Sequence, residues 1–387
     1  MIESLTLRNL KCFEELSLDL APLTVLTGFN AAGKSTSLQT LLLLCQSLRA
    51  EEWNRELRLN GPLVSLGTPG DVLNPNVNEK GLSLGIGTAG TDLMWNFGVV
   101  EHESRRALDA SSLNVRFSDS AGFELGPEKL MGLVPKEPEP RIEGAVQGLK
   151  RLVFLSALRQ VETEVFPIPQ NLGESPGDVG CVGQFAAWWL HQEGDSSIAV
   201  ERSLPSAIES RTLRAQLNAW TGEIFPGAEV NALPIPRTNL VRLEFRTGAT
   251  SEYRRPANVG YGISYAFPLL VAGLLGASER PVIIDSPEAH LHPRGQSKIG
   301  AFLAQMAASG SQFLIETHSD HVLNGIRLAV RGGIIKPEQV ATYFFTVLDS
   351  RPHIVRLAID KAGMIDDWPP GFFDQSEKDL ASLAGWV

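Results

Sequence analysis

The sequence predicts an α/β fold with a mixed sheet, and three stretches support this prediction. Residues 23–27, 281–285 and 312–316 are short apolar runs with the composition of buried strands. The first run leads through a glycine-rich loop into an apolar helix over residues 38–45. The second run ends in an acid, and the third leads into a T-H-S sequence. An N-terminal antiparallel β part and an inserted helical lobe complete the predicted architecture.

The glycine-rich loop matches G-x-x-x-x-G-K-[ST] between a strand and a helix, the context of a phosphate-binding loop, or P-loop. Its residues are Gly28-Phe29-Asn30-Ala31-Ala32-Gly33-Lys34-Ser35-Thr36. The glycines permit conformations closed to other residues, so the loop N–H groups and the helix N-terminus point at an anion. Lys34 adds a charge for the β- and γ-phosphates, and Ser35 adds a hydroxyl for Mg²⁺. We therefore predict binding of ATP with Mg²⁺. The alternative is a plain glycine turn.

Composition argues against several other classes of protein. The 387 residues are 43% hydrophobic, which is ordinary for a globular protein with one large core or two moderate ones. No apolar run approaches the ~20 residues of a membrane span, and the N-terminus lacks the pattern of a secretory signal. The 3 cysteines are too far apart for a disulfide framework or a zinc site. We expect a cytoplasmic protein without a membrane partner. Its net charge of −10 does not exclude DNA binding, because a local basic stripe is sufficient for that.

The N-terminal segment is predicted as a strand pair, over residues 2–10 and 16–20, because leucines alternate with polar residues in the second run. A strand pair directly before a P-loop resembles the start of RecF-like and SMC-like ATPases. This resemblance implies that Phe13, between the strands, contacts the nucleotide base. The alternative for Phe13 is a place in the core.

Residues 51–150 carry a weaker signal. Residues 82–87 and 93–100 are predicted as adjacent antiparallel strands, and 113–117 as another. Residues 127–140 are predicted as an exposed loop because of their prolines and charges. No heptad repeat is sustained, so we expect no long coiled-coil arm of the SMC type.

Residues 150–157 are predicted as a core strand, followed closely by Gln160. By position, Gln160 resembles the Q-loop glutamine of ABC-type ATPases, which contacts Mg²⁺ and water. A polar residue that simply follows a strand is the alternative. Arg159 is a second candidate for a phosphate contact. The elements predicted next are helices over 184–193 and 205–222 and strands over 230–233 and 241–245.

The tract from Pro281 to Pro293 is the most specific one after the P-loop. Its apolar strand ends in Asp285, an acid that would bind Mg²⁺ through water. The sequence P-E-x-H-L-H-P follows at residues 287–293. Here the chain resembles ABC-type ATPases of the RecF/SMC/OLD group, OLD being the overcoming-lysogenisation-defect nucleases. The resemblance implies that residues 289–292 form the D-loop, which touches the partner subunit.

One position departs from the pattern of that group. In this group the acid that ends the strand, here Asp285, is called the Walker B acid, and the catalytic glutamate directly follows it. In this chain Ser286 occupies the position of that glutamate. A serine hydroxyl is not a general base near neutral pH without help. Because general base catalysis is worth about 10²–10⁴-fold, its loss is costly. Glu288 or a water network is the candidate replacement, so we expect slow, regulated or partner-dependent hydrolysis of ATP.

Two further segments extend the resemblance. His318 matches the switch histidine, which implies a hydrogen bond to the γ-phosphate; a lone buried histidine is the alternative. Residues 258–264 precede an apolar helix over 265–275. They match the position of the signature segment of ABC-type ATPases. There a glycine–serine turn binds the γ-phosphate of the opposite subunit. The residues implied in this role are Gly260, Gly262 and Ser264. A helix N-cap is the alternative for Ser264.

The C-terminal residues 363–375 resemble the W-P-x-G-F-F-D box of a bacterial subfamily of these ATPases. Trp368, Phe372 and Phe373 form an apolar cluster that we expect to bury within the chain, with a partner interface as the alternative. The 69 residues after His318 are fewer than a Toprim nuclease domain needs, so we expect none.

The resemblance implies an ABC-type P-loop NTPase head. In the predicted division, residues 1–50 and 240–387 form the ATPase core. Residues 51–150 form an inserted β-rich arm, and residues 151–239 form the Q-loop strand with a helical lobe.

The preferred functional interpretation is an ATPase that forms a homodimer or higher oligomer by sandwiching ATP between subunits. The resemblance implies control of a separately encoded effector, such as a nuclease in anti-phage defence. One alternative is DNA repair or recombination, with DNA as a partner, and another is a non-hydrolysing ATP-dependent scaffold. The last alternative is a metallohydrolase with ligands drawn from His290, His292, His318, His321, Asp285 and Glu288.

Overall fold

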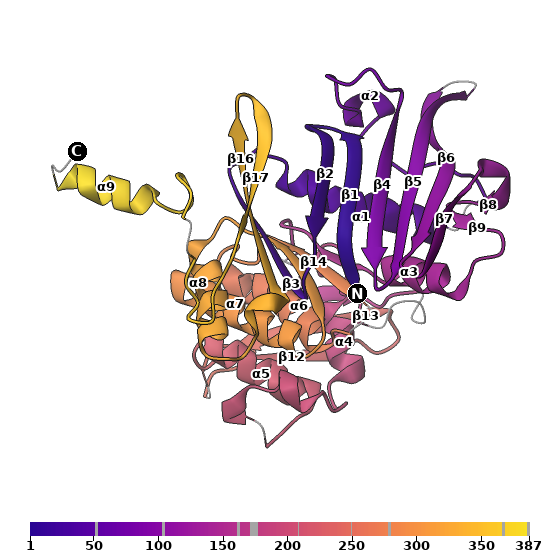
Figure 1. Cartoon of the computed structure of the whole chain (residues 1–387). Coiled ribbons are helices and arrows are strands. Elements are labelled where there is room, and N and C mark those ends of the chain that lie inside the picture. Colours follow the sequence, from indigo (N-terminus) through magenta and orange to yellow (C-terminus); the bar gives the residue numbers. More distant parts are fainter. Residues whose placement is uncertain are drawn as a thin grey trace.

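The computed structural model describes residues 1–50, 53–102, 105–160, 163–170, 177–207, 209–248, 250–277, 280–365 and 368–384. Two six-stranded sheets and a group of helices make up most of the fold (Figure 1). We call them the central sheet, which carries the P-loop, and the N-terminal sheet, which contains the first strand of the chain. The predicted α/β fold with a mixed sheet is confirmed.

The central sheet has five parallel strands and one antiparallel edge strand. Its order is β10 (Val153–Leu155), β14 (Pro281–Asp285), β15 (Gln312–Glu316), β3 (Leu23–Gly28), β16 (Val340–Leu348) and β17 (Arg351–Leu357). Strand β17 is the antiparallel one. The inner strands are buried on both faces, which explains why their sequences are apolar throughout rather than alternating.

The N-terminal sheet is antiparallel throughout. Its order is β2 (Phe13–Asp19), β1 (Ile2–Leu10), β4 (Gly81–Thr88), β5 (Thr91–His102), β6 (Arg105–Phe117) and β7 (Ser120–Leu125). Strand β2 begins three residues earlier than predicted, because Phe13 already pairs with Leu10. Strand β1 pairs with both β2 and β4, so residues 81–125 extend the sheet that the N-terminus begins. The division into structural units remains a prediction.

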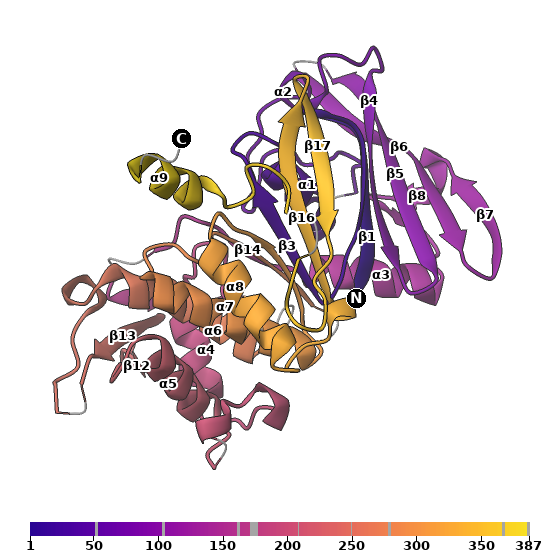
Figure 2. The same cartoon turned by 60° about the vertical axis from the view of Figure 1, so that its left-hand side comes forward.

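Helices cover both faces of the central sheet. Helices α1 (Lys34–Arg49) and α3 (Pro140–Lys150) share one core with the N-terminal sheet and with one face of the central sheet. The other face packs on α4 (Ala186–Glu193), α5 (Leu213–Ile224), α6 (Tyr261–Leu274), α7 (Pro293–Ala308) and α8 (Asp320–Arg331). Figure 2 shows α7 and α8 running along this face. The central sheet is therefore buried between two apolar layers.

Helix α5 is shorter than the helix predicted over residues 205–222. It begins at Leu213, because Thr212 is its N-cap and the Thr212 side chain accepts a hydrogen bond from the Ala215 N–H. Residues 205–207 form a separate 3₁₀ turn. Helix α6 in turn begins four residues before the predicted start at residue 265.

The remaining elements are short. The predicted loop over 127–140 contains a small hairpin, β8 (Leu130–Met131) and β9 (Val134–Pro135). The others are α2 (Pro69–Val72), the three-stranded sheet of β11 (Val165–Pro167), β13 (Leu240–Arg246) and β12 (Glu229–Pro234), and α9 (Gln375–Leu383). Helix α9 stands apart from the body in both views (Figures 1 and 2). None of the helices described has the length and apolar composition needed to span a bilayer.

Candidate functional site

The predicted site residues come from the carboxyl ends of neighbouring parallel strands. Strands β14, β15 and β3 are adjacent, and Asp285 at the end of β14 is the register partner of Glu316 at the end of β15. Glu316 is in turn opposite Leu26 of β3, just before the P-loop. The carboxyl ends of such strands are where α/β sheets place ligands. The topology therefore brings the loop and both acids to one edge of the sheet.

The P-loop has the backbone conformation of an anion cradle. Gly28 and Gly33 have φ of 129° and 102°, and Ala31 has φ of 61°, all in the left-handed region. At Gly28 any side chain would also collide with the backbone of Phe345. Helix α1 begins directly after Gly33, so its first N–H groups have no partner within the helix. These groups are available to an anion.

Lys34 is folded into the cradle. Its side chain is 3% exposed, and its Nζ donates to the carbonyl oxygens of Phe29 at 2.8 Å and Gly28 at 3.1 Å. Burial lowers the pKa of Lys34, and the nearby carboxylates of Glu316 and Asp285 oppose that shift. The ammonium is thus held among the loop's own carbonyls, close to where the cradle would hold phosphate oxygens.

Glu316 is a site residue that sequence reasoning missed. The Ser35 hydroxyl donates to Glu316 Oε1 at 3.0 Å, and Lys34 Nζ lies 4.0 Å from the same oxygen. Glu316 is 6% exposed, and its second oxygen, Oε2, is buried without a hydrogen-bond partner. Desolvation, followed by the charge of Asp285, raises the pKa of Glu316 to about 6. The signal was present in the sequence, because Glu316 ends an apolar strand just as Asp285 does.

The raised pKa of Glu316 makes stability depend on pH. Protonation of this carboxyl favours the folded state, so its contribution is full below about pH 4.5 and is lost as pH rises through about 6. Relative to Glu316→Gln, the free energy of unfolding of the wild-type chain should fall by about 2 kcal/mol across this window. The groups that influence the titration are Asp285, Lys34, Ser35 and Glu288.

Urea unfolding of both chains between pH 4 and 7.5 measures this difference. Groups that titrate identically in the two chains cancel in the comparison. A difference that stays constant over the whole range would contradict the pKa assigned to Glu316.

The turn after β14 commits the Ser286 hydroxyl to another bond. Ser286 has φ of 51°, its Oγ donates to Asp285 Oδ1 at 2.8 Å, and its N–H donates to the Glu316 carbonyl at 2.9 Å. The hydroxyl proton thus points at Asp285, and no base in this arrangement removes it. The expectation that Ser286 does not replace a catalytic glutamate stays a prediction.

Arg159 supports this turn instead of contacting phosphate, which corrects the sequence-based suggestion. Its guanidinium donates to the carbonyl oxygens of Asp285 at 2.9 Å, Tyr265 at 3.0 Å and Ser286 at 3.1 Å. The residue is 6% exposed, and burial lowers the pKa of Arg159 to about 10. A buried cation thereby ties the Walker B turn to helix α6.

Glu288 accepts hydrogen bonds from residues 317 and 318, which follow β15 and which we call the switch segment. Its Oε2 accepts a hydrogen bond from Thr317 Oγ1, and its Oε1 accepts one from the His318 N–H, both at 2.7 Å. Both carboxylate oxygens are therefore engaged. The His318 side chain is exposed, so the alternative of a lone buried histidine is wrong. Desolvation and then the charge of Lys34 lower the pKa of His318, which makes the ring neutral near pH 7.

Two predicted ligands lie outside this arrangement. Gln160 is exposed, and its side-chain amide donates to Thr163 Oγ1 at 2.8 Å. Phe13 is 4% exposed, and its ring covers the space that a side chain at Gly33 would need. Phe13 thus packs in the core beneath the loop and leaves little of its ring for a nucleotide base.

The predicted signature segment forms the first turn of α6. Gly260 is the N-cap of this helix, so the N-cap alternative for Ser264 is wrong. Ser264 is 5% exposed, and its buried hydroxyl has no hydrogen-bond partner. Gly262 lies against the carbonyl of His290, and the His290 ring is centred 4.4 Å from that of Tyr265. The first turn of α6 and the predicted D-loop are therefore packed together.

The residues named for a metallohydrolase do not assemble into a metal cage. Within the described parts of the chain, no three His, Cys, Asp or Glu residues are grouped to hold a metal ion. A Mg²⁺ ion beside Ser35 and Asp285 would need phosphate oxygens and water for its remaining ligands, as is usual for this ion.

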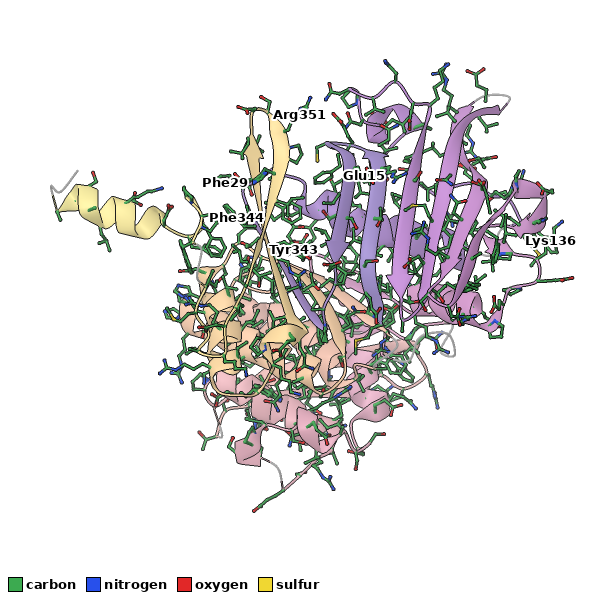
Figure 3. All side chains as sticks on the ribbon, viewed as in Figure 1. Glu15, Phe29, Lys136, Tyr343, Phe344 and Arg351 are labelled. Carbon is green, nitrogen blue, oxygen red and sulfur yellow. The ribbon has the colours of Figure 1, made fainter. Side chains whose placement is uncertain are left out.

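The C-terminal segment packs on the P-loop through a row of aromatic rings. Phe29 of the loop and Phe344 of β16 are 5.7 Å apart between ring centres (Figure 3), and Phe344 is 5.2 Å from Phe372. Phe372 is fully buried and is 4.6 Å from Trp368. The expected burial within the chain is confirmed for Phe372. Two members of the predicted box, residues 366 and 367, lie outside the described residues.

Comparisons with known proteins agree with this geometry. A family described as "AAA ATPase domain" matches residues 1–81, which contain the P-loop. A family described as "AAA domain, putative AbiEii toxin, Type IV TA system" matches residues 195–324, which contain the predicted signature, Walker B and switch segments. A third, described as "Protein of unknown function (DUF3696)", matches residues 335–383.

An OLD nuclease from Thermus scotoductus is 25% identical over 346 residues, which are 82% of this chain and 59% of that protein. The chain therefore spans somewhat more than half the length of this relative. A solved SMC head, bound to the C-terminal winged-helix domain of ScpA, superposes with a TM-score of 0.50 at 13% identity. That match covers 93% of this chain and 98% of the SMC head, and it shows the fold.

The fold is similar to that of an SMC head, and the site has the backbone of a phosphate-binding loop. More specifically, the matches support an AAA-type ATPase of the RecF/SMC/OLD-like group, related in sequence to an OLD nuclease and in fold to SMC heads.

Proposed function

We propose that the chain binds ATP with Mg²⁺ and hydrolyses it slowly or only under defined conditions. The observation that carries this proposal is the cradle formed by the P-loop, the buried Lys34, and Ser35 bonded to an acid at the end of the next strand. Loop N–H groups and Lys34 would hold the phosphates, and Ser35 and Asp285 would face the Mg²⁺. The ion would supply positive charge to the phosphate oxygens.

The state of the acids supports slow or regulated hydrolysis. Ser286 donates its proton to Asp285, and Glu288 has both oxygens in hydrogen bonds to the switch segment. A carboxylate has about four lone-pair sites, so Glu288 keeps sites for a proton, but the two hydrogen bonds stabilise its ionised form and make it a weaker base. Its basicity would therefore depend on the position of residues 317 and 318. The same engagement favours the second candidate, an ATP-dependent scaffold that does not hydrolyse.

Dimerisation around ATP is the second part of the proposal. Gly260 is the N-cap of α6, so the positive end of this helix lies at Gly260 to Gly262, and Tyr261 on this turn is 47% exposed. We propose that this turn, Gly260 to Gly262, faces the γ-phosphate held by the P-loop of a second copy. Backbone N–H groups would make the contact, because the Ser264 hydroxyl is buried within its own chain.

The proposed biological role is control of an effector. The similarity to an OLD nuclease supports an association with nucleic acid cleavage. We propose that the closed dimer regulates a separately encoded partner, a nuclease being the first candidate, in anti-phage defence. DNA is a candidate partner of the complex and would equally suit a role in repair or recombination.

Turnover measurements separate the ATPase from the scaffold. Phosphate release is measured with and without DNA for the wild-type chain, Lys34→Ala and Glu288→Gln. The proposal expects slow wild-type turnover, none in Lys34→Ala, and a further loss of about 10²–10⁴-fold in Glu288→Gln if Glu288 is the base. ATP binding without turnover in every condition would establish the scaffold instead.

Light scattering with a non-hydrolysable ATP analogue tests dimerisation. The wild-type chain should double its mass on binding the analogue, and Gly260→Arg should remain a monomer that still binds it. Space is open around Gly260, so the substitution blocks an interface without straining its own chain. A wild-type chain that stays monomeric with the analogue bound would contradict the composite site.

A further inference from the structure

We infer that Glu316 is an acidic residue of the metal–nucleotide site, which aligns the Ser35 hydroxyl for a divalent cation and couples the cation to the bound phosphates. This inference rests on the proposed function, because it assumes that the cradle holds ATP. Glu316 was not among the residues that the sequence motifs identify.

The first argument is the direction of the Ser35 proton. A serine hydroxyl has one proton and two lone pairs. The Ser35 proton points at Glu316 Oε1, 3.0 Å away, so both lone pairs of Ser35 Oγ face other directions. A hydroxyl held in this way presents its oxygen to a cation. Glu316 therefore acts on the cation through Ser35 as a positioning residue.

The second argument is the unpaired oxygen. Glu316 is 6% exposed, and its Oε2 is buried without a partner, although a buried carboxylate oxygen is costly to leave unpaired. Lys34 lies 4.0 Å from the other oxygen, Oε1, and does not satisfy Oε2. A water molecule bound to the cation would supply the missing donor. This arrangement is typical of a group that orients a metal ligand.

The third argument is the charge of the site. Among the described residues, the charges of Asp285 and Glu288 act on Glu316, and the cations of this cluster are Lys34 and Arg159. Three negative groups against two positive ones leave an excess of negative charge, with Arg159 committed to backbone carbonyls. Because this excess would repel a polyphosphate, the site favours ATP only together with a divalent cation.

The test compares nucleotide affinity with and without metal. The affinity of a fluorescent ATP analogue is measured in EDTA and in excess Mg²⁺ for the wild-type chain and Glu316→Gln. Glutamine keeps the shape and removes the charge. The ratio of the two affinities is the coupling between metal and nucleotide. This readout requires no hydrolysis.

The expected result is opposite in sign in the two conditions. In EDTA, Glu316→Gln should bind the analogue several-fold more tightly than the wild-type chain, because a repelling charge is gone. In Mg²⁺ it should bind more weakly, so that the coupling ratio falls by about 10- to 100-fold. A merely structural defect would weaken binding in both conditions. Glu15→Gln, on the exposed Arg8–Glu15 pair of the N-terminal sheet (Figure 3), is the matched control and should keep the wild-type ratio.

A double-mutant cycle checks the path through Ser35. If part of the Glu316 effect passes through the Ser35 hydroxyl, Ser35→Ala combined with Glu316→Gln should lower the coupling ratio by less than the two single losses add up to. A coupling ratio unchanged in Glu316→Gln, or additive losses in the double variant, would overturn the inference while leaving ATP binding intact. Failure of the wild-type chain to bind the analogue at all would overturn the proposed function, and this inference with it.

Discussion

Lys34→Ala is expected to weaken ATP binding by at least about 100-fold. The Lys34 ammonium is the cation of the cradle, and it is buried against the carbonyl oxygens of Gly28 and Phe29. Hydrogen bonds to charged groups contribute about 1.5–3 kcal/mol each, and about 1.4 kcal/mol corresponds to a tenfold change in affinity. Removing the ammonium also leaves Glu316 without its nearest cation, which adds repulsion toward phosphate.

Titration with a fluorescent ATP analogue measures this loss, and thermal unfolding shows whether the variant remains folded. Lys129→Ala removes an exposed lysine from the 3₁₀ turn Pro127–Lys129, outside the P-loop, and should bind as the wild-type chain does. If Lys34→Ala bound the analogue within a few-fold of the wild-type affinity, the P-loop would not be the phosphate site.

Arg159→Ala is expected to lower the free energy of unfolding by about 3–5 kcal/mol. The guanidinium donates to four backbone carbonyl oxygens, the fourth being that of Ser156, and each buried acceptor left unpaired costs about 1–3 kcal/mol. The alanine also leaves space where the side chain was packed. Because two of the carbonyls belong to Asp285 and Ser286, the loss also releases the turn that positions the Walker B acid.

Urea unfolding of the wild-type chain and Arg159→Ala measures this loss in the free energy of unfolding. Arg159→Lys keeps the charge but lacks the planar fork, so it should retain only part of the stability. Arg8→Ala, in an exposed ion pair whose side chains are each 59% exposed, should change stability by no more than about 0.5 kcal/mol. Equal effects of Arg159→Ala and Arg8→Ala would show that the buried network does not stabilise the fold.

Local sequence patterns predicted the central part of the site because that part is local. The P-loop, Asp285 and His318 each sit at the end of an apolar run, and parallel pairing of adjacent strands then brings them together. The two hydrogen bonds of Glu288 could not be predicted from the sequence, because they depend on where the Thr317–His318 segment passes the Walker B turn.

Other features depend on contacts between distant segments. The pairing of β1 with β4 joins residues about 80 positions apart, and nothing in either strand specifies the other. Arg159 was a candidate for a phosphate contact, yet three of its carbonyl partners lie more than 100 residues further along the chain. Glu316 was overlooked for a different reason: the T-H-S sequence beside it attracted the functional interpretation, although a buried acid at the end of a strand is itself a signal.

The row of aromatic rings from Phe29 to Trp368 has a mechanical consequence. Gly371 leaves no room for a side chain, because the Phe29 ring occupies that space, and Phe372 fills the position behind Phe344. Residues Gly371 and Phe372 therefore belong to the packing that supports the P-loop. A chain cut before residue 368 would lose these contacts and expose Phe344, which is 3% exposed in the full chain, so the phosphate loop would have greater freedom. A binding event that pulls on α9 would act on the same rings and, through Phe29, on the P-loop.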